Sequence, residues 1–393
     1  MAQQYKDLFF SGDLYGDYSY TNYHLTGSRG NDRLFGNGGD DTLYGDDGND
    51  RLWGAEGDDD LDGGQGSDIL FIDRGNNSYS GGSNYYPNVD GPSTDTLAFY
   101  DVVTYASNVL GMLAWSHEFK EFTVGFNVDL ESGVTLSQAL SVSGGGGYTD
   151  NWGTNQFDKF ERIEMTNEND VVRDNDDSTE IMGRGGNDTL EGRGGADFLR
   201  GGSGTDTASY ESASSGIYAN LLQNRGLLND AEGDTYESIE NLVGSGFDDI
   251  LYGTNGANRI QGRGGRDDII GHQGADTLIG GSGDDHFIYR RTSDSTAAAG
   301  GRDSILDFQK GQDLIDLLGI DARSGTSAND SFSFIGSSNF SGFAGQLRSS
   351  LARDESGAQF NLVQGDVTGD GAADFSIAVY SAGQALSSND FFL

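Results

Sequence analysis

The sequence predicts an all-β fold, a parallel β-solenoid with wider β connectors and a C-terminal β-rich capping domain, on three observations. Glycine and aspartate recur every nine residues, an apolar residue stands in phase with them, and the chain has 63 acidic residues but only 23 basic ones. A short fixed period is typical of solenoids, in which each repeat adds a small unit to a continuous stack. The period therefore indicates the fold, the apolar residue indicates the core, and the acids indicate the kind of partner.

Three blocks of the chain keep the nine-residue spacing without a slip. They cover residues 27–71, 183–209 and 244–288. Every unit begins with glycine and carries aspartate at its sixth place, except that Asn258 stands there in one unit. Upstream of the second block the same frame continues imperfectly through Asp170 and Thr179, so degenerate turns are expected to extend it backwards.

Each unit is expected to form a turn followed by a very short strand. Glycine at the first and fourth places tolerates left-handed backbone angles that a side chain disfavours. The eighth place is apolar and is expected to point inward, whereas the seventh and ninth places flank it and face outward by strand alternation. The eighth-place residues are Leu34, Leu43, Leu52, Leu61, Leu70, Leu190, Leu199, Ala208, Leu251, Ile260, Ile269, Leu278 and Phe287. One unit alone cannot bury this face, so the units must stack.

Stacking brings the sixth-place aspartates together in rows. Neighbouring strands lie roughly 4.8 Å apart, and unneutralised carboxylates at such a spacing repel each other. A divalent cation between adjacent turns removes the repulsion, and mixed carboxylate and carbonyl oxygens suit calcium better than magnesium, which keeps its waters. The candidate calcium ligands are Asp32, Asp41, Asp50, Asp59, Asp68, Asp188, Asp197, Asp206, Asp249, Asp267, Asp276 and Asp285, with Gly27, Gly36, Gly45, Gly54, Gly183, Gly192, Gly262 and Gly271.

The composition argues against several other classes of protein. A net charge of −40 opposes binding to nucleic acid and to anionic membrane surfaces. No apolar run has the length of a membrane span. Cysteine is absent, so neither disulfides nor thiolate metal sites are available. A disordered tract would share the acidic, glycine-rich composition, but disorder does not require leucine in phase with aspartate.

The units resemble the RTX nonapeptide G-G-x-G-x-D-x-U-x of secreted bacterial toxins, proteases and alginate epimerases, where U is a large apolar residue. The resemblance implies a parallel β-roll in which one turn takes two units and each of several calcium ions lies between a loop and the next loop on the same side. The pairs it implies are Asp32 with Asp50, Asp41 with Asp59, Asp50 with Asp68, Asp188 with Asp206, Asp249 with Asp267, and Asp267 with Asp285. Asn258 places in doubt the site that it would share with Asp276.

Two segments between the blocks, 95–165 and 206–243, are similar to each other and rich in β-branched and aromatic residues. They are expected to form wider turns of the same solenoid. The predicted parts are an N-terminal cap at 1–26, a first roll at 27–71, an enlarged connector at 72–182, a second roll at 183–209, a connector at 210–243, a third roll at 244–288 and a C-terminal domain at 289–393. Aromatic residues of the enlarged connector either pack its turns or form a platform for sugar rings. They are Tyr79, Tyr85, Tyr86, Tyr100, Trp115 and Trp152.

From Tyr289 onward the nine-residue frame stops. Residues 303–317 alternate like strands joined by a tight turn. Together with residues 365–375 they resemble the C-terminal domain of serralysin-type metalloproteases. The first, third, fifth and ninth places of an EF-hand loop are matched by Asp366, Thr368, Asp370 and Asp374. Ile377 stands where the loop needs its twelfth-place glutamate, which argues against a separate calcium ion there.

The last residues, Asp390-Phe391-Phe392-Leu393, resemble the acidic-then-apolar ending that type I secretion systems read. The N-terminal residues lack the apolar core of a cleaved signal peptide, so export by a type I apparatus is expected. Low cytosolic calcium would leave the acidic chain unfolded for export, and the higher external concentration would fold it. The predicted location is therefore outside a bacterial cell or at its surface.

No catalytic module is recognisable, because His24, His117, His272 and His286 are isolated from one another. The chain is predicted to be a non-catalytic structural, surface-layer, matrix or adhesion element. Self-assembly of several copies of the chain would suit such a role. An exopolysaccharide-binding module and an RTX-associated polysaccharide-modifying enzyme stay open as alternatives. Basic residues that would meet anionic uronates are Arg184, Arg193, Arg200, Arg259, Arg263 and Arg266.

Overall fold

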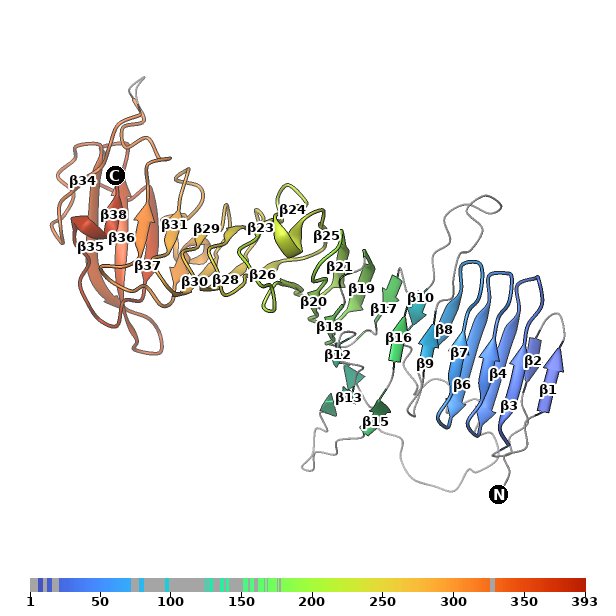
Figure 1. The fold of residues 1–393 in the computed structure, drawn as a ribbon. Coiled ribbons are helices and arrows are strands. Elements are labelled where there is room, and N and C mark those ends of the chain that lie inside the picture. The colour runs from blue at the N-terminus through green and yellow to red at the C-terminus, as the bar shows by residue number, and fades with distance from the viewer. Residues whose placement is uncertain are drawn as a thin grey trace. The chain divides into compact units, whose positions relative to one another are not determined.

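The computed structural model describes residues 21–71 and 162–393, apart from 166, 168, 175, 177 and 326–328, together with the backbone of short strands elsewhere (Figure 1). The chain divides into two compact units, Met1–Asp206 and Thr207–Leu393. The described residues contain strands and short 3-10 turns and no α-helix. None of them forms a helix long and apolar enough to cross a membrane.

The first unit is built from short parallel strands. They are β1 (Lys6–Phe9), β2 (Asp13–Tyr15), β3 (Tyr23–Thr26), β4 (Arg33–Gly38), β5 (Thr42–Tyr44), β6 (Arg51–Glu56), β7 (Asp60–Asp62), β8 (Ile69–Phe71), β9 (Ser78–Ser80), β10 (Thr96–Ala98), β12 (Asn127–Asp129), β16 (Gln156–Asp158), β17 (Arg162–Glu164), β18 (Val171–Arg173), β19 (Glu180–Gly185), β20 (Thr189–Glu191) and β21 (Phe198–Ser203). Two antiparallel pairs complete it, formed by β11 (Val124–Gly125) with β14 (Ala139–Leu140) and by β13 (Thr135–Ser137) with β15 (Asn151–Thr154).

The chain of the first roll alternates between two facing sheets, and β12, β18 and β20 of the first unit belong to a further sheet. One has the strand order β1-β3-β5-β7-β9-β16, and the other runs β2-β4-β6-β8-β10-β17-β19-β21. Neighbours in a sheet are two units apart, as in the register of Leu34 with Leu52 and of Leu52 with Leu70. Two nine-residue units therefore make one turn of a parallel β-roll, as the sequence predicts.

The second unit repeats this arrangement and ends in a larger sheet. Its elements are β22 (Thr207–Ser209), β23 (Tyr218–Asn220), β24 (Arg225–Leu227), η1 (Asn229–Ala231), β25 (Thr235–Glu237), β26 (Asn241–Val243), β27 (Ile250–Tyr252), β28 (Arg259–Gly264), β29 (Asp268–Ile270), β30 (Thr277–Ser282), β31 (His286–Ile288), η2 (Ala299–Gly301), β32 (Asp303–Ile305), β33 (Leu314–Asp316), β34 (Ser333–Phe334), β35 (Gln346–Arg353), β36 (Gln359–Asp366), β37 (Phe375–Val379), η3 (Ser388–Asp390) and β38 (Phe391–Phe392). The strand orders are β22-β26-β28-β30-β32-β37-β36-β35-β34 and β24-β23-β27-β29-β31-β33-β38.

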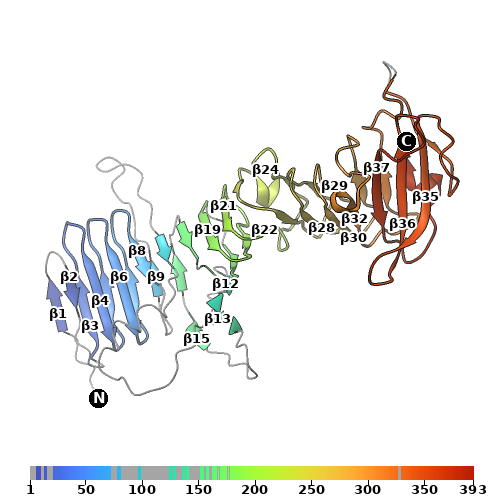
Figure 2. The ribbon, with the colours of Figure 1, turned by 180° about the vertical axis from the view of Figure 1, so that it is seen from behind.

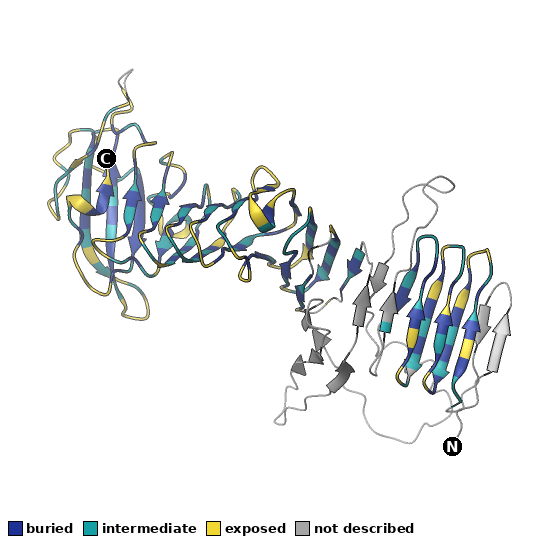
Figure 3. Ribbon diagram, in the orientation of Figure 1, coloured by how far each residue is buried: buried dark blue, intermediate teal, exposed yellow. Residues whose placement is uncertain are grey.

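A thin apolar core runs between the two sheets of each roll (Figure 3). The eighth-place side chains Leu34, Leu52 and Leu70 have no exposed surface, and Ile269 and Phe287 of the third roll have none either. The seventh place is exposed or half-buried and the eighth is buried, as in β7. The ninth place is buried as well in β8, β20, β22 and β29, so the expectation that it faces outward is wrong there. Burying a leucine or isoleucine contributes roughly 1.5–3 kcal/mol, so the stack gains stability with each unit that joins it.

The glycines follow a different rule from the one the sequence suggests. Fourth-place glycines such as Gly48 are left-handed, with φ 149°, which confirms the expectation for that place. First-place glycines are not left-handed, and the prediction is wrong there. The second place adopts positive φ instead, even with a side chain, as at Asn37 (76°) and Arg263 (82°). The first place needs glycine because of a close approach to the aspartate of its own unit.

The C-terminal region extends the roll before it caps it (Figure 2). β32 pairs in parallel with β30, and β33 pairs in parallel with β31. The two predicted strands are present, but the connection between them is a crossover between sheets, because each strand continues a different sheet of the roll. β37 then pairs in parallel with β32, and the antiparallel strands β36 and β35 continue the same sheet beyond it. In the other sheet β38 pairs in parallel with β33.

The connectors behave as wider turns where the structure describes them. In the second connector, β23 pairs in parallel with β27 of the third roll, and β24 is a small antiparallel addition to β23. β26 pairs in parallel with β22 on one side and with β28 of the third roll on the other. The degenerate turns around Asp170 and Thr179 stack on the second roll through β17 with β19 and β18 with β20. The side chains of the predicted aromatic platform, Tyr79 to Trp152, lie outside the described residues, as does His117. The domain boundaries stay predictions.

Candidate metal centre

The sixth-place aspartates form hydrogen-bonded ladders along the rolls. In each step the main-chain N–H of one aspartate donates to Oδ1 of the aspartate 18 residues later, as from Asp32 to Asp50 at 2.7 Å. The other steps run from Asp41 to Asp59, Asp50 to Asp68, Asp188 to Asp206, Asp249 to Asp267 and Asp267 to Asp285, at 2.8–3.0 Å. Asp197 accepts the corresponding bond from Thr179 at 2.8 Å. Every pair that the sequence predicts is thus brought together.

The second oxygen of these carboxylates is the unusual feature. It is buried and has no hydrogen-bond partner in Asp41, Asp50, Asp188, Asp267, Asp276 and Asp285. The aspartate side chains themselves are no more than 1% exposed in these residues. A buried polar atom without a partner costs free energy unless another group satisfies it, so each of these oxygens calls for a ligand.

First-place glycines bring main-chain oxygens to the same spot. A Cβ at Gly36 would lie 2.3 Å from Oδ2 of Asp41 and 2.7 Å from the carbonyl oxygen of Gly54, and a Cβ at Gly262 would meet Asp267 and Gly280 at 2.1 and 2.7 Å. A carboxylate oxygen and a carbonyl oxygen of the next turn therefore border one Cβ-sized space. Two acceptors gathered in this way suit a hard cation.

Burial perturbs the acidity of the ladder. Desolvation raises the pKa of Asp50 to about 7, of Asp188 to about 8 and of Asp267 to about 8, and neighbouring carboxylates raise it further, against hydrogen bonds that lower it. In the third roll, burial likewise raises the pKa of Asp276 to about 8. Near neutral pH the ladder must therefore either hold protons or find a counter-charge.

The donor set fits calcium. No group of three or more His, Asp or Glu side chains gathers around one point among the described residues, so side chains alone do not enclose a metal. The ladders instead combine two aspartates per step with carbonyl oxygens, and calcium accepts mixed carboxylate and carbonyl oxygens. Nitrogen and sulfur ligands, which zinc prefers, take no part in the ladders.

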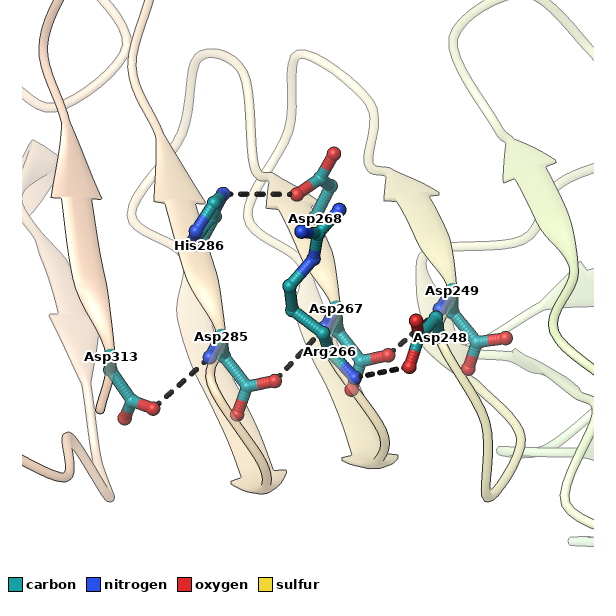
Figure 4. Close-up of polar contacts among 8 residues, drawn as sticks. All are labelled: Asp248, Asp249, Arg266, Asp267, Asp268, Asp285, His286 and Asp313. Atoms are coloured by element: carbon teal, nitrogen blue, oxygen red, sulfur yellow. Dashed lines mark hydrogen bonds and ion pairs between the residues drawn. The ribbon is translucent and has the colours of Figure 1, made fainter.

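Sequence reasoning missed two members of the ladders. Oδ1 of Asp303 accepts from the N–H of Asp276 at 2.9 Å. Oδ1 of Asp313 accepts from the N–H of Asp285 at 3.2 Å, as Figure 4 shows. Their separations from these donors are 27 and 28 residues, whereas the regular step is 18. Asp303 is thus one period further along the chain than the regular step, and Asp313 lies outside the nine-residue frame. The signal that could have found them is the local order of aspartate, any residue and isoleucine, which both share with the repeats.

A second polar ladder runs along the fifth place. The side-chain oxygen of Asn31 accepts from the N–H of Asn49, and Asn49 accepts in turn from Ser67, both at 3.0 Å. In the third roll Asp248 accepts from the N–H of Arg266 at 2.7 Å. This ladder lies beside the aspartates but is exposed, so it ties turns together without burying charge.

The other candidates from the sequence have other roles. Both oxygens of Asp366 accept main-chain N–H groups, from Gly369 and Gly371, so this carboxylate is satisfied without a metal. Arg184 pairs with Glu164, and Arg263 pairs with Glu211, both at 2.6 Å.

Further basic residues and histidines are placed as follows. Arg200 lies 4.9 Å over the ring of Phe198, Arg193 is half-buried, and Arg259 and Arg266 are exposed. His286 contacts Asp268 at 3.3 Å, and His272 lies beside Tyr252, where burial lowers its pKa.

Comparison with known families agrees with this geometry. The RTX calcium-binding nonapeptide repeat matches residues 24–52, 35–70, 44–79 and 174–208. The chain is therefore a β-roll protein with RTX nonapeptide repeats, which bind several calcium ions. Residues 230–393 match the Peptidase M10 serralysin C terminal family, so the chain also carries a serralysin C-terminal domain. Both are typical of secreted bacterial proteins.

Individual relatives overlap the chain in part. Metallopeptidase AprA of Pseudomonas marginalis is 37% identical over 209 residues, which are 53% of this chain and 38% of that protein. The AlgE6R2 and AlgE6R3 subunits of the Azotobacter vinelandii mannuronan C5-epimerase are 19% and 17% identical. The match to AlgE6R2 covers 48% of this chain and 92% of that subunit, at a TM-score of 0.25. The match to AlgE6R3 covers 57% of this chain and 78% of that subunit, at a TM-score of 0.20. These scores are too low to bear on function.

Proposed function

We propose that the sixth-place aspartates, together with first-place glycine carbonyls, hold calcium ions between stacked turns, and that the chain is exported unfolded and folds on calcium outside the cell. The observation that supports this most is the buried carboxylate oxygen without a partner beside a carbonyl of the next turn. At Gly36 these atoms are Oδ2 of Asp41 and the carbonyl oxygen of Gly54. A divalent cation turns the repulsion between such acceptors into attraction.

Calcium thereby becomes a condition for folding. The core is one apolar side chain deep, and the net charge of −40 opposes compaction. Ligand binding to the folded form alone stabilises it in proportion to the logarithm of the ligand concentration for each site. Several sites in series therefore make folding depend steeply on calcium, which suits a chain that must stay unfolded until it is exported.

We assign no catalytic step to the ladders and propose a structural, matrix or adhesion role. The aspartates of the ladders are 0–3% exposed, so a substrate cannot reach them. The ion pairs of Arg184 and Arg263 also satisfy two of the arginines that an anionic polysaccharide would contact. What the rolls offer is a stiff stack whose seventh-place side chains face outward.

The test is a calcium titration of the full chain from metal-stripped buffer. Circular dichroism should report a cooperative gain of β structure, native mass spectrometry should count several bound calcium ions, and magnesium should not replace calcium. A chain that keeps its full β signal and melting temperature in chelator would contradict the proposal. Electron microscopy of the calcium form then tests the structural role, which sheets or filaments would support.

A further inference from the structure

We propose that Asn258 takes the place of a bound calcium ion at the start of the third roll, so that this turn is closed by hydrogen bonds and binds no cation on the side facing Glu240. This inference rests on the proposed function, because it defines which turns depend on calcium. Asn258 is the one sixth-place residue of the three repeat blocks that is not aspartate.

The turn of Asn258 is built like its neighbours. Its N–H donates to Oδ1 of Asp276 at 2.9 Å, which is the same step that joins aspartates elsewhere. A Cβ at Gly253 would lie 2.4 Å from Oδ1 of Asn258 and 2.8 Å from the carbonyl oxygen of Gly271. The amide oxygen thus occupies the position of a carboxylate oxygen, and the substitution leaves the stacking intact.

The amide nitrogen does what an aspartate cannot do. Nδ2 of Asn258 donates to the carbonyl oxygen of Glu240 at 2.6 Å and to Oγ1 of Thr254 at 3.0 Å, while Oδ1 accepts from the N–H of Thr254 at 2.7 Å. The orientation of the amide is fixed, because a carbonyl can only accept and an N–H can only donate. The side chain is 4% exposed and has partners at both ends.

Glu240 explains why aspartate is not used here. In the other steps the preceding turn offers an N–H to the carboxylate, whereas residue 240 offers its carbonyl oxygen. An aspartate at position 258 would place a carboxylate oxygen against that carbonyl at about the same 2.6 Å. Two acceptors at this distance repel unless a cation or a proton lies between them.

Two other starting turns are closed in a related way. In the first unit of the first roll, Ser28 donates its N–H and its hydroxyl to Oδ2 of Asp32, at 2.6 and 3.0 Å. In the first unit of the third roll, Ser245 donates its N–H to Oδ2 and its hydroxyl to Oδ1 of Asp249, at 2.6 and 2.8 Å. Thr254 holds the same second place in the unit of Asn258, so both ladders of the third roll and the ladder of Asp32 begin with a serine or threonine cap.

Later turns of the third roll carry no such cap. Their second-place residues Arg263, His272 and Gly281 have φ of 82°, 68° and 103°, so the backbone has turned over. The carboxylates of Asp267, Asp276 and Asp285 in these turns each keep a buried oxygen without a partner. The conformation of the second place therefore separates turns closed by hydrogen bonds from turns that need a cation.

The experiment compares the number of calcium ions bound by the full chain and by Asn258→Asp, counted by native mass spectrometry in calcium. The variant should bind one ion more than the wild type and should need more calcium to fold. Asn255→Asp is the matched control, because Asn255 is exposed in the same unit and the charge change is identical. Asn255→Asp should leave the number of bound calcium ions unchanged.

An equal count in Asn258→Asp and wild type overturns the inference, since Asn258 would then be a calcium ligand or its turn would adapt without a cation. If the wild type itself takes up no calcium, the proposed function fails instead, so the two failures are distinct. Thr254→Ala covers the case in which Asn258→Asp does not fold. It removes the half-buried hydroxyl that accepts from Nδ2 of Asn258, and it should raise the unfolding equilibrium constant about fivefold in calcium, with the ion count unchanged. Stability equal to that of Ser282→Ala, at an exposed serine, overturns the inference as well.

Discussion

The N–H of Asp267 donates to Oδ1 of Asp285 at 3.0 Å, which holds two buried carboxylates in neighbouring turns of one sheet (Figure 4). A contact of this kind joins like charges by a main-chain bond. It is tolerable in the folded chain if protons or cations neutralise the acids. The consequences of that requirement can be measured.

Asp267→Asn should have opposite effects with and without calcium. Burial raises the pKa of Asp267 to about 8, so near pH 7 in metal-stripped buffer this carboxyl must take up a proton on folding. Asparagine avoids that cost, so the melting temperature should rise or stay level. In saturating calcium the substitution removes a ligand from two steps of the ladder, and stability should fall by roughly 1–3 kcal/mol. Asp284→Asn, at an exposed site in the same roll, is the control for lost charge. A loss of stability of equal size in both buffers would contradict the prediction.

The calcium-free chain should fold better in acid than at neutral pH. The pKa is raised to about 7 in Asp68 and to about 8 in Asp188, mainly by burial, above the value of about 4 for a free aspartate. The folded form then holds protons that the unfolded form releases. The contribution of these carboxyl groups to the stability of the folded form is fully present below about pH 4, and it is lost as the pH rises through 7 to 8.

The measurement is a series of thermal melts by circular dichroism in metal-stripped buffer between pH 5 and 8. In calcium the trend should reverse, because protons compete with the cation for the same oxygens. A calcium-free melting temperature that climbs with pH would show that the ladder carboxylates are charged in the folded form.

Alanine at a first-place glycine should impair calcium binding. In Gly262→Ala the new Cβ would meet Oδ2 of Asp267 at 2.1 Å and the carbonyl oxygen of Gly280 at 2.7 Å. Something must shift, and overpacking of this kind costs roughly 1–3 kcal/mol. Gly246→Ala is a matched control in the same roll, since nothing lies within 4 Å of its Cβ position. The calcium concentration at the midpoint of folding should rise for Gly262→Ala and stay unchanged for Gly246→Ala. Equal midpoints for the two variants would contradict the close approach.

Shortening one core side chain should weaken the third roll. Ile269→Ala removes part of a side chain with no exposed surface, between Leu251 and Phe287 in neighbouring strands. The expected loss is about 2–5 kcal/mol in calcium, measured by urea denaturation. Ile250→Ala, at the half-buried seventh place, should cost clearly less. Equal losses would show that the eighth place is not the core of the roll.

Much of the fold could be read from the residues because the repeat is strict. The phase of leucine and aspartate predicts which places face the core and which carry the acids. The resemblance to RTX repeats, with two units per turn, then implies the steps from Asp32 to Asp50 and from Asp249 to Asp267. Asp303 and Asp313 were missed because insertions lengthen the regular 18-residue step to 27 and 28 residues, and the repeat does not predict the length of an insertion. The left-handed second place escaped for a different reason, since Arg263 and Asn37 adopt a conformation that their side chains disfavour and that only the stacked turn imposes.

The sequence by itself determined the period, the apolar row at the eighth place and the demand for cations, because these depend on residue types at fixed spacing. The tertiary structure decided which oxygen of each carboxylate is already satisfied. That depends on whether the preceding turn presents an N–H, as Asp249 does to Asp267, or a carbonyl, as Glu240 does to Asn258. The physical reason is that a peptide unit can turn over without any change in the repeat pattern, and its direction is set by the turns packed on either side.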